Sequence, residues 1–328
     1  MIIELKDLKK TFKIYKKEEG LLNSLKSLIK RDVVFVEAVK GINLKIEKGE
    51  RVGFLGPNGA GKSTTIKMMC GILHPTSGDI NILGFNPLKN RKKYVKNIGV
   101  IFGQKSQLWF DIPAVDSFYL HREIYGIEED IFEERLEFLT NLLSVKEIIK
   151  RPVRNLSLGE RMKCEFIASL LHNPPVLFLD EPTIGVDAIS KDEIRNFLHE
   201  VNKKFNTTFI LTTHDMDDIE EVCNRVVIID KGTIIYDGSL KKLKSKYVKH
   251  TNIKIDYSKV KNKKKFESLL KKADIIVDGK SYKELKLSKD LDINKILKDI
   301  MSSVDVVDLS IQEPRLESVI KEIYKEVK

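Results

Sequence analysis

The glycine-rich stretch from residue 56 to residue 64 has a spacing that predicts chemistry. It matches the pattern GxxxxGK[ST] and lies between the apolar stretch RVGFL and a predicted helix, which is the context that a phosphate-binding loop requires. Glycines let successive backbone N–H groups turn toward an anion, and the helix that follows adds the positive end of its dipole. The pattern predicts a nucleoside triphosphate site made by Gly56, Pro57, Asn58, Gly59, Ala60, Gly61, Lys62, Ser63 and Thr64.

Within this loop, two side chains have specific expected roles. We expect Lys62 to reach the β- and γ-phosphates and the Ser63 hydroxyl to ligate Mg²⁺.

Two acids, Asp180 and Glu181, follow the most apolar predicted strand of the chain, VLFL. Ligands of parallel sheets sit beyond the carboxyl ends of the strands, so both acids are expected beside the phosphate loop. Asp180 fits a partner of Mg²⁺, acting through water or Ser63, and Glu181 fits a general base that polarises the attacking water. His214, after the predicted strand TFILTT, is expected at the same edge, where it could position that water. The alternative for the two acids is a cap on the next helix.

These residues require a scaffold in which strands and helices alternate. The pattern predicts strands in 1–14 and 33–56 and at VLFLD, TTFILTTH and RVVIID, with helices at 62–70, within 116–150, and at 159–172, 189–204 and 215–223. Such alternation indicates a right-handed α/β core around a parallel sheet. From about residue 245 the pattern changes to short strands and helices, which predicts a small α+β domain.

An insertion at about 17–36 interrupts the first strands. Leu21, Leu22, Leu25, Leu28 and Ile29 form one apolar stripe of a short helix. The stripe could pack on the chain's own strands, or it could dock on a membrane-embedded partner or a lipid surface.

The segment LSLGE distinguishes between families that share the phosphate loop. It resembles the LSGGQ signature of ABC ATPases, and the order phosphate loop, Gln104, signature, Asp180–Glu181, Asp187 and His214 follows that family's series across residues 1–240. The chain departs from the signature at Leu158 and Glu160. Ser157 can cap its helix and, with Gly159, offer donors to an anion. The signature residues are Leu156, Ser157, Leu158, Gly159 and Glu160.

The resemblance implies roles for further residues and a second copy of the chain. In this family the signature contacts ATP bound to the opposite subunit, so two domains close head to tail around two ATP molecules. Gln104 looks like the glutamine that senses Mg²⁺, with Gln107 as the alternative, and Asp187 matches the loop that bridges the two sites. Phe12 stands where the family stacks an aromatic ring on adenine. Tyr15 and Phe35 are its rivals.

The resemblance also implies the domain organisation. It predicts an ABC ATPase domain at 1–244 that contains an antiparallel β subdomain and a helical subdomain at about 105–172, followed by an α+β accessory domain at 245–328.

Composition limits the partners. The 328 residues carry a formal net charge of +10, and residues 241–328 hold 23 Lys and Arg against 14 Asp and Glu, so the excess lies outside the ATPase motifs. Arginine is scarce in that part, and we expect a solvated surface and no nucleic-acid partner. The three cysteines stand far apart, which argues against a zinc site or a disulfide framework. No apolar run is long enough to cross a bilayer, so we expect a cytoplasmic protein.

The finer resemblance is to ATP-binding subunits of ABC-2-type exporters of the multidrug branch. It rests on GQKSQLWFDIPAVDSF, LSLGERMKCE, EPRLESVI and the insertion. It implies ATP and Mg²⁺ as cofactors, membrane-spanning permease subunits on separate chains, a homodimer, and a location at the inner face of the cell membrane. The alternatives are a non-transport ABC ATPase that acts on nucleic acid or ribosomes, and an importer or lipoprotein-release ATPase.

Overall fold

The fold is described from a computed structural model that covers residues 1–15, 33–103, 105–247, 250–271, 273–288, 291–312, 314 and 316–326. The chain divides into two compact units, Met1–Ser239 and Leu240–Lys328. The domain boundary predicted from the sequence lies a few residues later, after residue 244. Each unit is described by itself.

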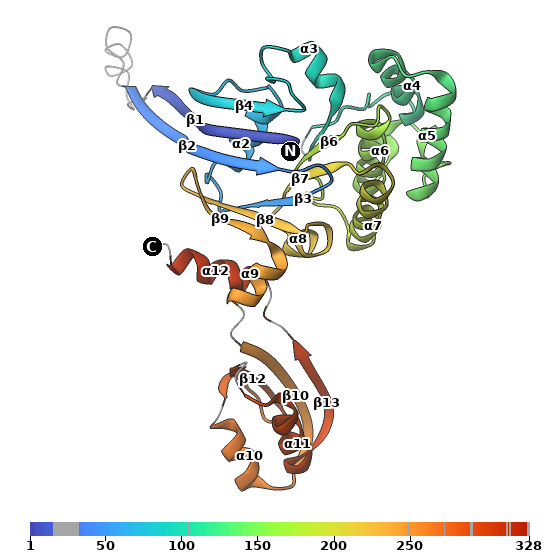
Figure 1. The fold of residues 1–328 in the computed structure, drawn as a ribbon. Helices are drawn as coiled ribbons and strands as arrows, with labels where there is room; N and C mark the ends of the chain where they lie inside the picture. Colours follow the sequence, from blue (N-terminus) through green and yellow to red (C-terminus); the bar gives the residue numbers. More distant parts are fainter. Residues whose placement is uncertain are drawn as a thin grey trace, which may run out of the picture. The chain divides into compact units, whose positions relative to one another are not determined.

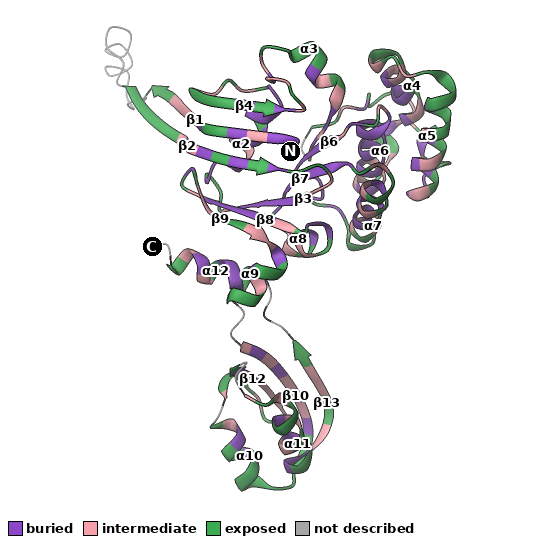
Figure 2. Ribbon diagram, viewed as in Figure 1, coloured by how far each residue is buried: buried purple, intermediate pink, exposed green. Residues whose placement is uncertain are grey.

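The centre of the first unit is a six-stranded sheet in the order β5-β6-β7-β3-β8-β9. All neighbours are parallel except β8 and β9, which form an antiparallel pair. The strands β3, β6 and β7 are apolar along nearly their whole length and almost entirely buried (Figure 2). Helices cover such parallel sheets on both faces, which explains the continuous apolar runs. The strands are β3 (Arg51–Leu55), β5 (Ile98–Phe102), β6 (Val176–Asp180), β7 (Thr208–Thr212), β8 (Arg225–Asp230) and β9 (Thr233–Ser239).

Helices alternate with these strands, and this confirms the predicted α/β core (Figure 1). Those that follow the strands of the parallel sheet are α2 (Lys62–Met69), α7 (Ala188–Phe205) and α8 (Met216–Val222). Two short helices precede β5, namely α3 (Arg91–Tyr94) and η1 (Val95–Asn97). The helices between β5 and β6 are α4 (Ala114–Tyr125), α5 (Glu129–Leu142), η2 (Ile148–Lys150), η3 (Val153–Asn155) and α6 (Leu158–Leu170).

A second, antiparallel sheet in the order β2-β1-β4 completes the first unit. Its strands are β1 (Ile3–Tyr15), β2 (Val33–Ile46) and β4 (Ser77–Ile82). Ile3, Leu5 and Ile42 point into a core shared with β3 and α2. Most of the predicted insertion, including its leucine stripe, lies outside the described residues. The last part of the insertion, 33–36, forms the exposed start of β2 and pairs with the end of β1.

The second unit contains an antiparallel sheet in the order β11-β12-β10-β13. With the helices between the strands, the order β-α-β-β-α-β is the split βαβ arrangement of ferredoxin-like domains, so a small α+β fold is present as predicted. Ile253, Ile255, Leu285 and Leu287 pack under Ile300 in its core. Helices α9 and α12 pack against each other. The elements are α9 (Leu240–Tyr247), β10 (His250–Val260), α10 (Lys263–Leu270), β11 (Asp274–Asp278), β12 (Tyr282–Ser288), α11 (Ile293–Ser303), β13 (Val304–Gln312) and α12 (Leu316–Glu326).

Two further observations concern the sequence expectations. Across the described residues, no helix has both the length and the apolar character needed to cross a membrane. All three cysteines are buried free thiols.

Candidate functional site

The glycine-rich loop joins β3 to α2, and its glycines allow close approach of neighbouring strands. A Cβ at Gly61 would lie 2.5 Å from the carbonyl oxygen of Ala38, and Gly61 has a φ of +108°. A Cβ at Gly56 would lie 2.3 Å from the carbonyl oxygen of Ile229. Side chains at these positions would push the loop away from β2 and β8, so the glycines fix its shape.

Lys62, the first residue of α2, lies across this loop. Its Nζ donates hydrogen bonds to the carbonyl oxygens of Gly56, at 2.6 Å, and Pro57, at 3.1 Å. Burial lowers the pKa of Lys62, while the charges of Glu181 and Asp180 oppose that shift. The ammonium is therefore held by neutral carbonyls, close to two acids, at the place where the sequence predicts phosphates.

Ser63 faces the end of β6. Its Oγ donates a hydrogen bond to Asp180 Oδ1 at 3.1 Å, and Thr212 Oγ1 donates to the same oxygen at 2.6 Å. A hydroxyl next to a carboxylate fits Mg²⁺, which takes few protein ligands and completes its shell with water and phosphate oxygens. The described residues contain no cluster of three or more His, Cys, Asp or Glu that could hold a metal.

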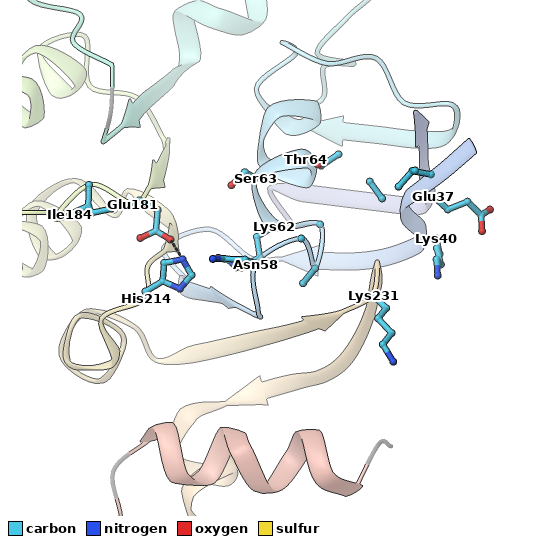
Figure 3. A pocket seen from close by; sticks show the side chains of 15 residues that line it. Glu37, Lys40, Asn58, Lys62, Ser63, Thr64, Glu181, Ile184, His214 and Lys231 are labelled. Carbon is cyan, nitrogen blue, oxygen red and sulfur yellow. Dashed lines mark ion pairs between the residues drawn. The ribbon is translucent and has the colours of Figure 1, made fainter. Parts of the chain in front are cut away.

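Glu181 adopts a left-handed backbone conformation, with a φ of +54°. Its N–H donates to the carbonyl of Thr212 at 2.9 Å, and its Oε1 lies 3.1 Å from Nε2 of His214 (Figure 3). Positive φ at a non-glycine residue costs energy and persists only where neighbours enforce it. The end of β6 is thus bent so that Glu181 and His214 meet.

Gly103 is one of the neighbours that enforce this bend. Its N–H donates to the carbonyl of Asp180 at 2.9 Å, and a Cβ here would lie 1.9 Å from the carbonyl oxygen of Glu181. Only glycine fits so close to that backbone. Gly103 was given no role from the sequence, because its contact becomes visible only once β5 and β6 are known to be adjacent.

These groups surround a pocket of about 630 Å³ (Figure 3). Its lining joins the phosphate loop to Glu181 and His214, as predicted. It also includes six residues that were not predicted from the sequence to line the site: Val36, Glu37, Ala38, Lys40, Ile184 and Lys231. Lys231 occupies the tight β8–β9 turn, where the N–H of Gly232 donates to Ala60 at 2.9 Å. That hairpin contact could not be read from the sequence.

The three candidates for adenine stacking do not line this pocket. Phe12 pairs with Val36 across β1 and β2, and Val36 lines the pocket while Phe12 does not. Tyr15 and Phe35 are exposed. None of the described lining residues is Phe, Tyr or Trp. Gln104 lies outside the described residues.

Ser157 begins α6 with a reciprocal capping box. Ser157 Oγ accepts from the N–H of Glu160 at 3.2 Å, and Glu160 Oε2 accepts from the N–H of Ser157 at 2.8 Å. The backbone N–H bond lowers the pKa of Glu160, assisted by Arg151 at 2.6 Å. The expected cap is present, and the capping box explains why a glutamate suits position 160.

Gly159 is buried against the segment that contains Asp187. A Cβ at Gly159 would lie 2.3 Å from Ser190 Oγ and 2.9 Å from Asp187 Oδ2. Asp187 caps α7 by accepting from the N–H of Ser190 at 2.9 Å. The signature and the Asp187 loop therefore form one packed surface. Within the described part of the chain, none of residues 156–160 lines the pocket.

A buried carboxylate on α6 was missed by the sequence analysis. Glu165 Oε2 accepts from the N–H of Gln107 at 3.2 Å, its carbonyl accepts from Gln107 Nε2 at 3.2 Å, and Ser106 Oγ also donates to the side chain. Burial raises the pKa of Glu165, which these hydrogen bonds oppose. Gln107, the alternative to Gln104, is thus turned toward α6.

Known proteins of similar sequence share a family. The sequence model of a family described as "ABC transporter" matches residues 39–184. ABC transporter ATP-binding protein NatA of Bacillus subtilis is 34% identical over 208 residues, covering 63% of this chain and 84% of that protein. Bacitracin transport ATP-binding protein BcrA of Bacillus licheniformis is 34% identical, covering 65% and 69%. Linearmycin resistance ATP-binding protein LnrL of Bacillus subtilis is 30% identical over 289 residues, covering 85% and 91%.

Solved structures share the fold. CbiO1 from Clostridium perfringens, described as part of the ABC transporter complex cbiONQ, has a TM-score of 0.61 and 28% identity, covering 74% of this chain and 90% of that one. The ATP-binding cassette MJ0796, solved as a dimer in a post-hydrolysis state with ADP and Pi, has a TM-score of 0.60 and 22% identity, covering 73% and 99%.

Proposed function

The chain belongs to the ABC transporter family as an ATP-hydrolysing subunit, and we propose that it powers an exporter by closing head to tail with a second copy around two ATP molecules. The observation that carries this proposal is the separation of two sets of functional groups. The first set, which we call the strand-end half, consists of the phosphate loop with Asp180, Glu181 and His214. The second, the helix-tip half, consists of residues 156–160 with Asp187.

The strand-end half has the groups needed to bind ATP and cleave it. Lys62 exchanges its loop carbonyls for the β- and γ-phosphates, and Ser63 and Asp180 would hold Mg²⁺, which neutralises phosphate charge. Gln104 is proposed as a further sensor of the metal. Phe12 stays a proposal for adenine contact without support from the pocket lining.

Hydrolysis needs one water oriented toward the γ-phosphorus. Glu181 polarises that water. The oxygen of the water then bonds to the γ-phosphorus while the bond between this phosphorus and the ADP oxygen breaks. His214, in contact with Glu181 at 3.1 Å, is placed to donate to the γ-phosphate.

The helix-tip half offers donors that its own phosphate loop does not use. Ser157 is exposed at the positive end of α6, and this end does not line the pocket of the same copy. A triphosphate held by a second copy would accept hydrogen bonds from this end of α6. A closed two-fold dimer uses both halves of each copy once, which favours a homodimer.

The exporter class is supported by the names of the relatives. BcrA is named for bacitracin transport and LnrL for linearmycin resistance. The alignment with LnrL spans 289 residues, more than the first unit contains, so this likeness extends into the second unit. We propose permease subunits on separate chains as partners, which would hold this chain at the inner face of the cell membrane.

The dimer is tested by mixing two inactive variants. Lys62→Ala damages the strand-end half and Ser157→Arg damages the helix-tip half, so each variant alone is expected to lose hydrolysis. In a mixed head-to-tail dimer one site is built from two intact halves. Random pairing should restore about a quarter of wild-type activity, because half of the dimers are mixed and each has one intact site. No recovery at any mixing ratio would exclude a site shared between copies.

The direction of transport is tested in inverted membrane vesicles that carry the full complex. ATP added outside is expected to drive labelled bacitracin, or another antibiotic cargo, into the lumen. Vesicles with Glu181→Gln are the control. ATP-dependent loss of cargo from preloaded vesicles would instead indicate import.

A further inference from the structure

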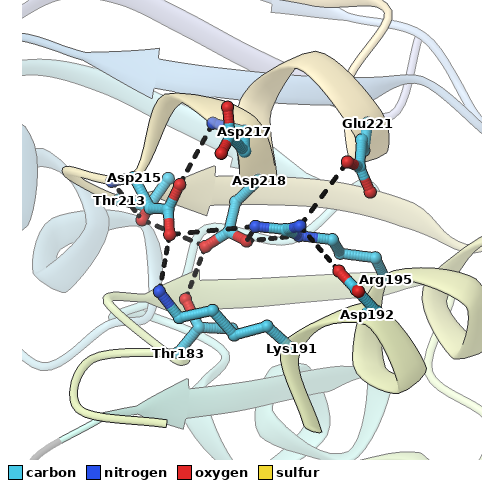
Figure 4. A network of polar contacts seen from close by, with 9 residues as sticks. All are labelled: Thr183, Lys191, Asp192, Arg195, Thr213, Asp215, Asp217, Asp218 and Glu221. Carbon is cyan, nitrogen blue, oxygen red and sulfur yellow. Dashed lines mark hydrogen bonds and ion pairs between the residues drawn. The ribbon is translucent and has the colours of Figure 1, made fainter. Parts of the chain in front are cut away.

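One buried carboxylate outside the proposed hydrolytic site binds three different elements around it. Asp218 of α8 is 2% exposed. It accepts hydrogen bonds from Thr183 Oγ1 at 2.5 Å, from Thr213 Oγ1 at 3.3 Å and from Arg195 Nε at 2.7 Å (Figure 4). Asp218 is therefore a buried carboxylate that links separate segments of the chain, and not a surface charge.

Two of the three donors lie in loops next to the proposed hydrolytic residues, and the third lies on α7. Thr183 lies two residues after Glu181, and Thr213 directly precedes His214. Arg195 lies on α7, the helix that Asp187 caps. One carboxylate thus binds the loop after β6, the loop after β7 and α7.

We propose that Asp218 is a positioning residue for the hydrolytic pair, acting through Thr183 on Glu181 and through Thr213 on His214. The proposal rests on the roles given to Glu181 and His214 above.

The exposure of His214 supports this role. Its side chain is 55% exposed, so packing around the ring does not set its distance to Glu181. The backbone on either side must do so. Thr213 is bound to Asp218, and the following residue, Asp215, forms an ion pair with Lys191 of α7 at 2.5 Å. The N–H of Asp215 also donates to Thr213 Oγ1 at 3.0 Å.

The conformation of Glu181 also supports the positioning role of Asp218. A left-handed glutamate needs surroundings that enforce its backbone angles. The Thr183 hydroxyl fixes the chain just after this bend to a carboxylate that cannot move, because Arg195 neutralises it in the interior. Arg195 is itself held by Asp192 at 3.0 Å and Glu221 at 3.5 Å.

The sharpest test removes one hydroxyl without changing the shape of the side chain. Thr183→Val deletes the bond to Asp218. Thr140→Val is the matched control, because Thr140 is equally buried and donates to Leu136 within α5, far in sequence from the hydrolytic loops. We expect Thr183→Val to lower kcat about fivefold and Asp218→Asn about thirtyfold, with KM for ATP unchanged. Thr140→Val should leave kcat unchanged at a similar Tm.

A double-mutant cycle separates positioning from general stability. In a Glu181→Gln background, measured by single-turnover hydrolysis, Thr183→Val is expected to cost less than twofold, because the carboxylate that it positions is gone. An undiminished fivefold loss in that background, or equal effects of Thr183→Val and Thr140→Val, would overturn the proposal.

Glu181→Gln in the same assay distinguishes the two levels of inference. If that variant retains turnover, the proposed function itself fails. If Glu181→Gln and His214→Ala both abolish hydrolysis while Thr183→Val equals its control, only the role of Asp218 fails.

Discussion

The strand-end half and the helix-tip half of the ATP site are built by different means. In the strand-end half, three parallel strands end at one edge, so residues far apart in sequence meet in one pocket. In the helix-tip half, a single helix start satisfies itself with a local capping box and leaves Ser157 exposed. The first half is built within one chain, whereas we propose that the second presents its donors to another copy.

The largest expected effect is on the strand-end half alone. Glu181→Gln removes the proposed base while keeping the shape of the side chain, so kcat should fall about 10²–10³-fold with ATP affinity retained. Steady-state hydrolysis and light scattering with Mg²⁺ and ATP would show an inactive, trapped dimer. Glu200→Gln, an exposed position on α7, is the control. Full turnover of the Glu181 variant would remove this residue from the mechanism.

A smaller loss is expected from the helix-tip half. Ser157→Arg should lower hydrolysis about thirtyfold and leave ATP binding by a single copy unchanged, because the phosphate loop is untouched. Ser157→Ala separates the two roles of the serine, since losing the cap alone costs about 1 kcal/mol of stability. Nucleotide titrations at protein concentrations that keep the chain monomeric would check the first point. Weaker binding there would place Ser157 in the same copy's site.

Two glycines should differ in their cost to stability. Gly103→Ala puts a Cβ against the backbone carbonyl of Glu181, which cannot yield without moving the bend. Gly159→Ala meets the side chain of Ser190, with its Oγ at 2.3 Å, which can rotate, and its Cβ at 2.8 Å, which needs a small shift of α7. We expect the first to cost about 2–3 kcal/mol and the second about 1 kcal/mol, by urea denaturation. Equal costs would mean that the bend at Glu181 is less constrained than its contacts indicate.

The smallest effect concerns His172, just after the C-terminal end of α6, where its Nε2 donates to the carbonyl oxygen of Ile98 at 3.0 Å and its ring stacks on Tyr125. Burial lowers the pKa of His172 to about 4. The unfolded chain, with a pKa near 6.5, then binds more protons than the folded chain between these values, so stability falls as pH decreases.

Between pH 7 and 5.5 the loss attributable to His172 is about 1 kcal/mol. Urea midpoints across this range should have a shallower pH slope in His172→Gln than in the wild type. An unchanged slope would show that His172 is not the titrating group.

Local patterns were enough to predict much of this site. The glycine loop, the apolar strand before Asp180 and the Ser157 cap each depend on neighbours within a few residues, and the parallel arrangement of the core strands follows from general rules for α/β folds.

Contacts between distant segments were not predictable. Gly103 acquires its role only because β5 lies beside β6, and Glu165 meets Gln107 from 58 residues away. Phe12 matched a family position, but the register of β1 against β2 places Val36 in the pocket lining instead. These outcomes depend on three-dimensional neighbours, which residue types alone do not specify.

The bonds of Lys62 to the carbonyls of Gly56 and Pro57 have a consequence for how nucleotide arrives. The loop is braced by its own ammonium, so nucleotide binding exchanges these two carbonyl contacts of Lys62 for contacts with phosphate oxygens. Measured affinity then reports the difference between the two sets of bonds.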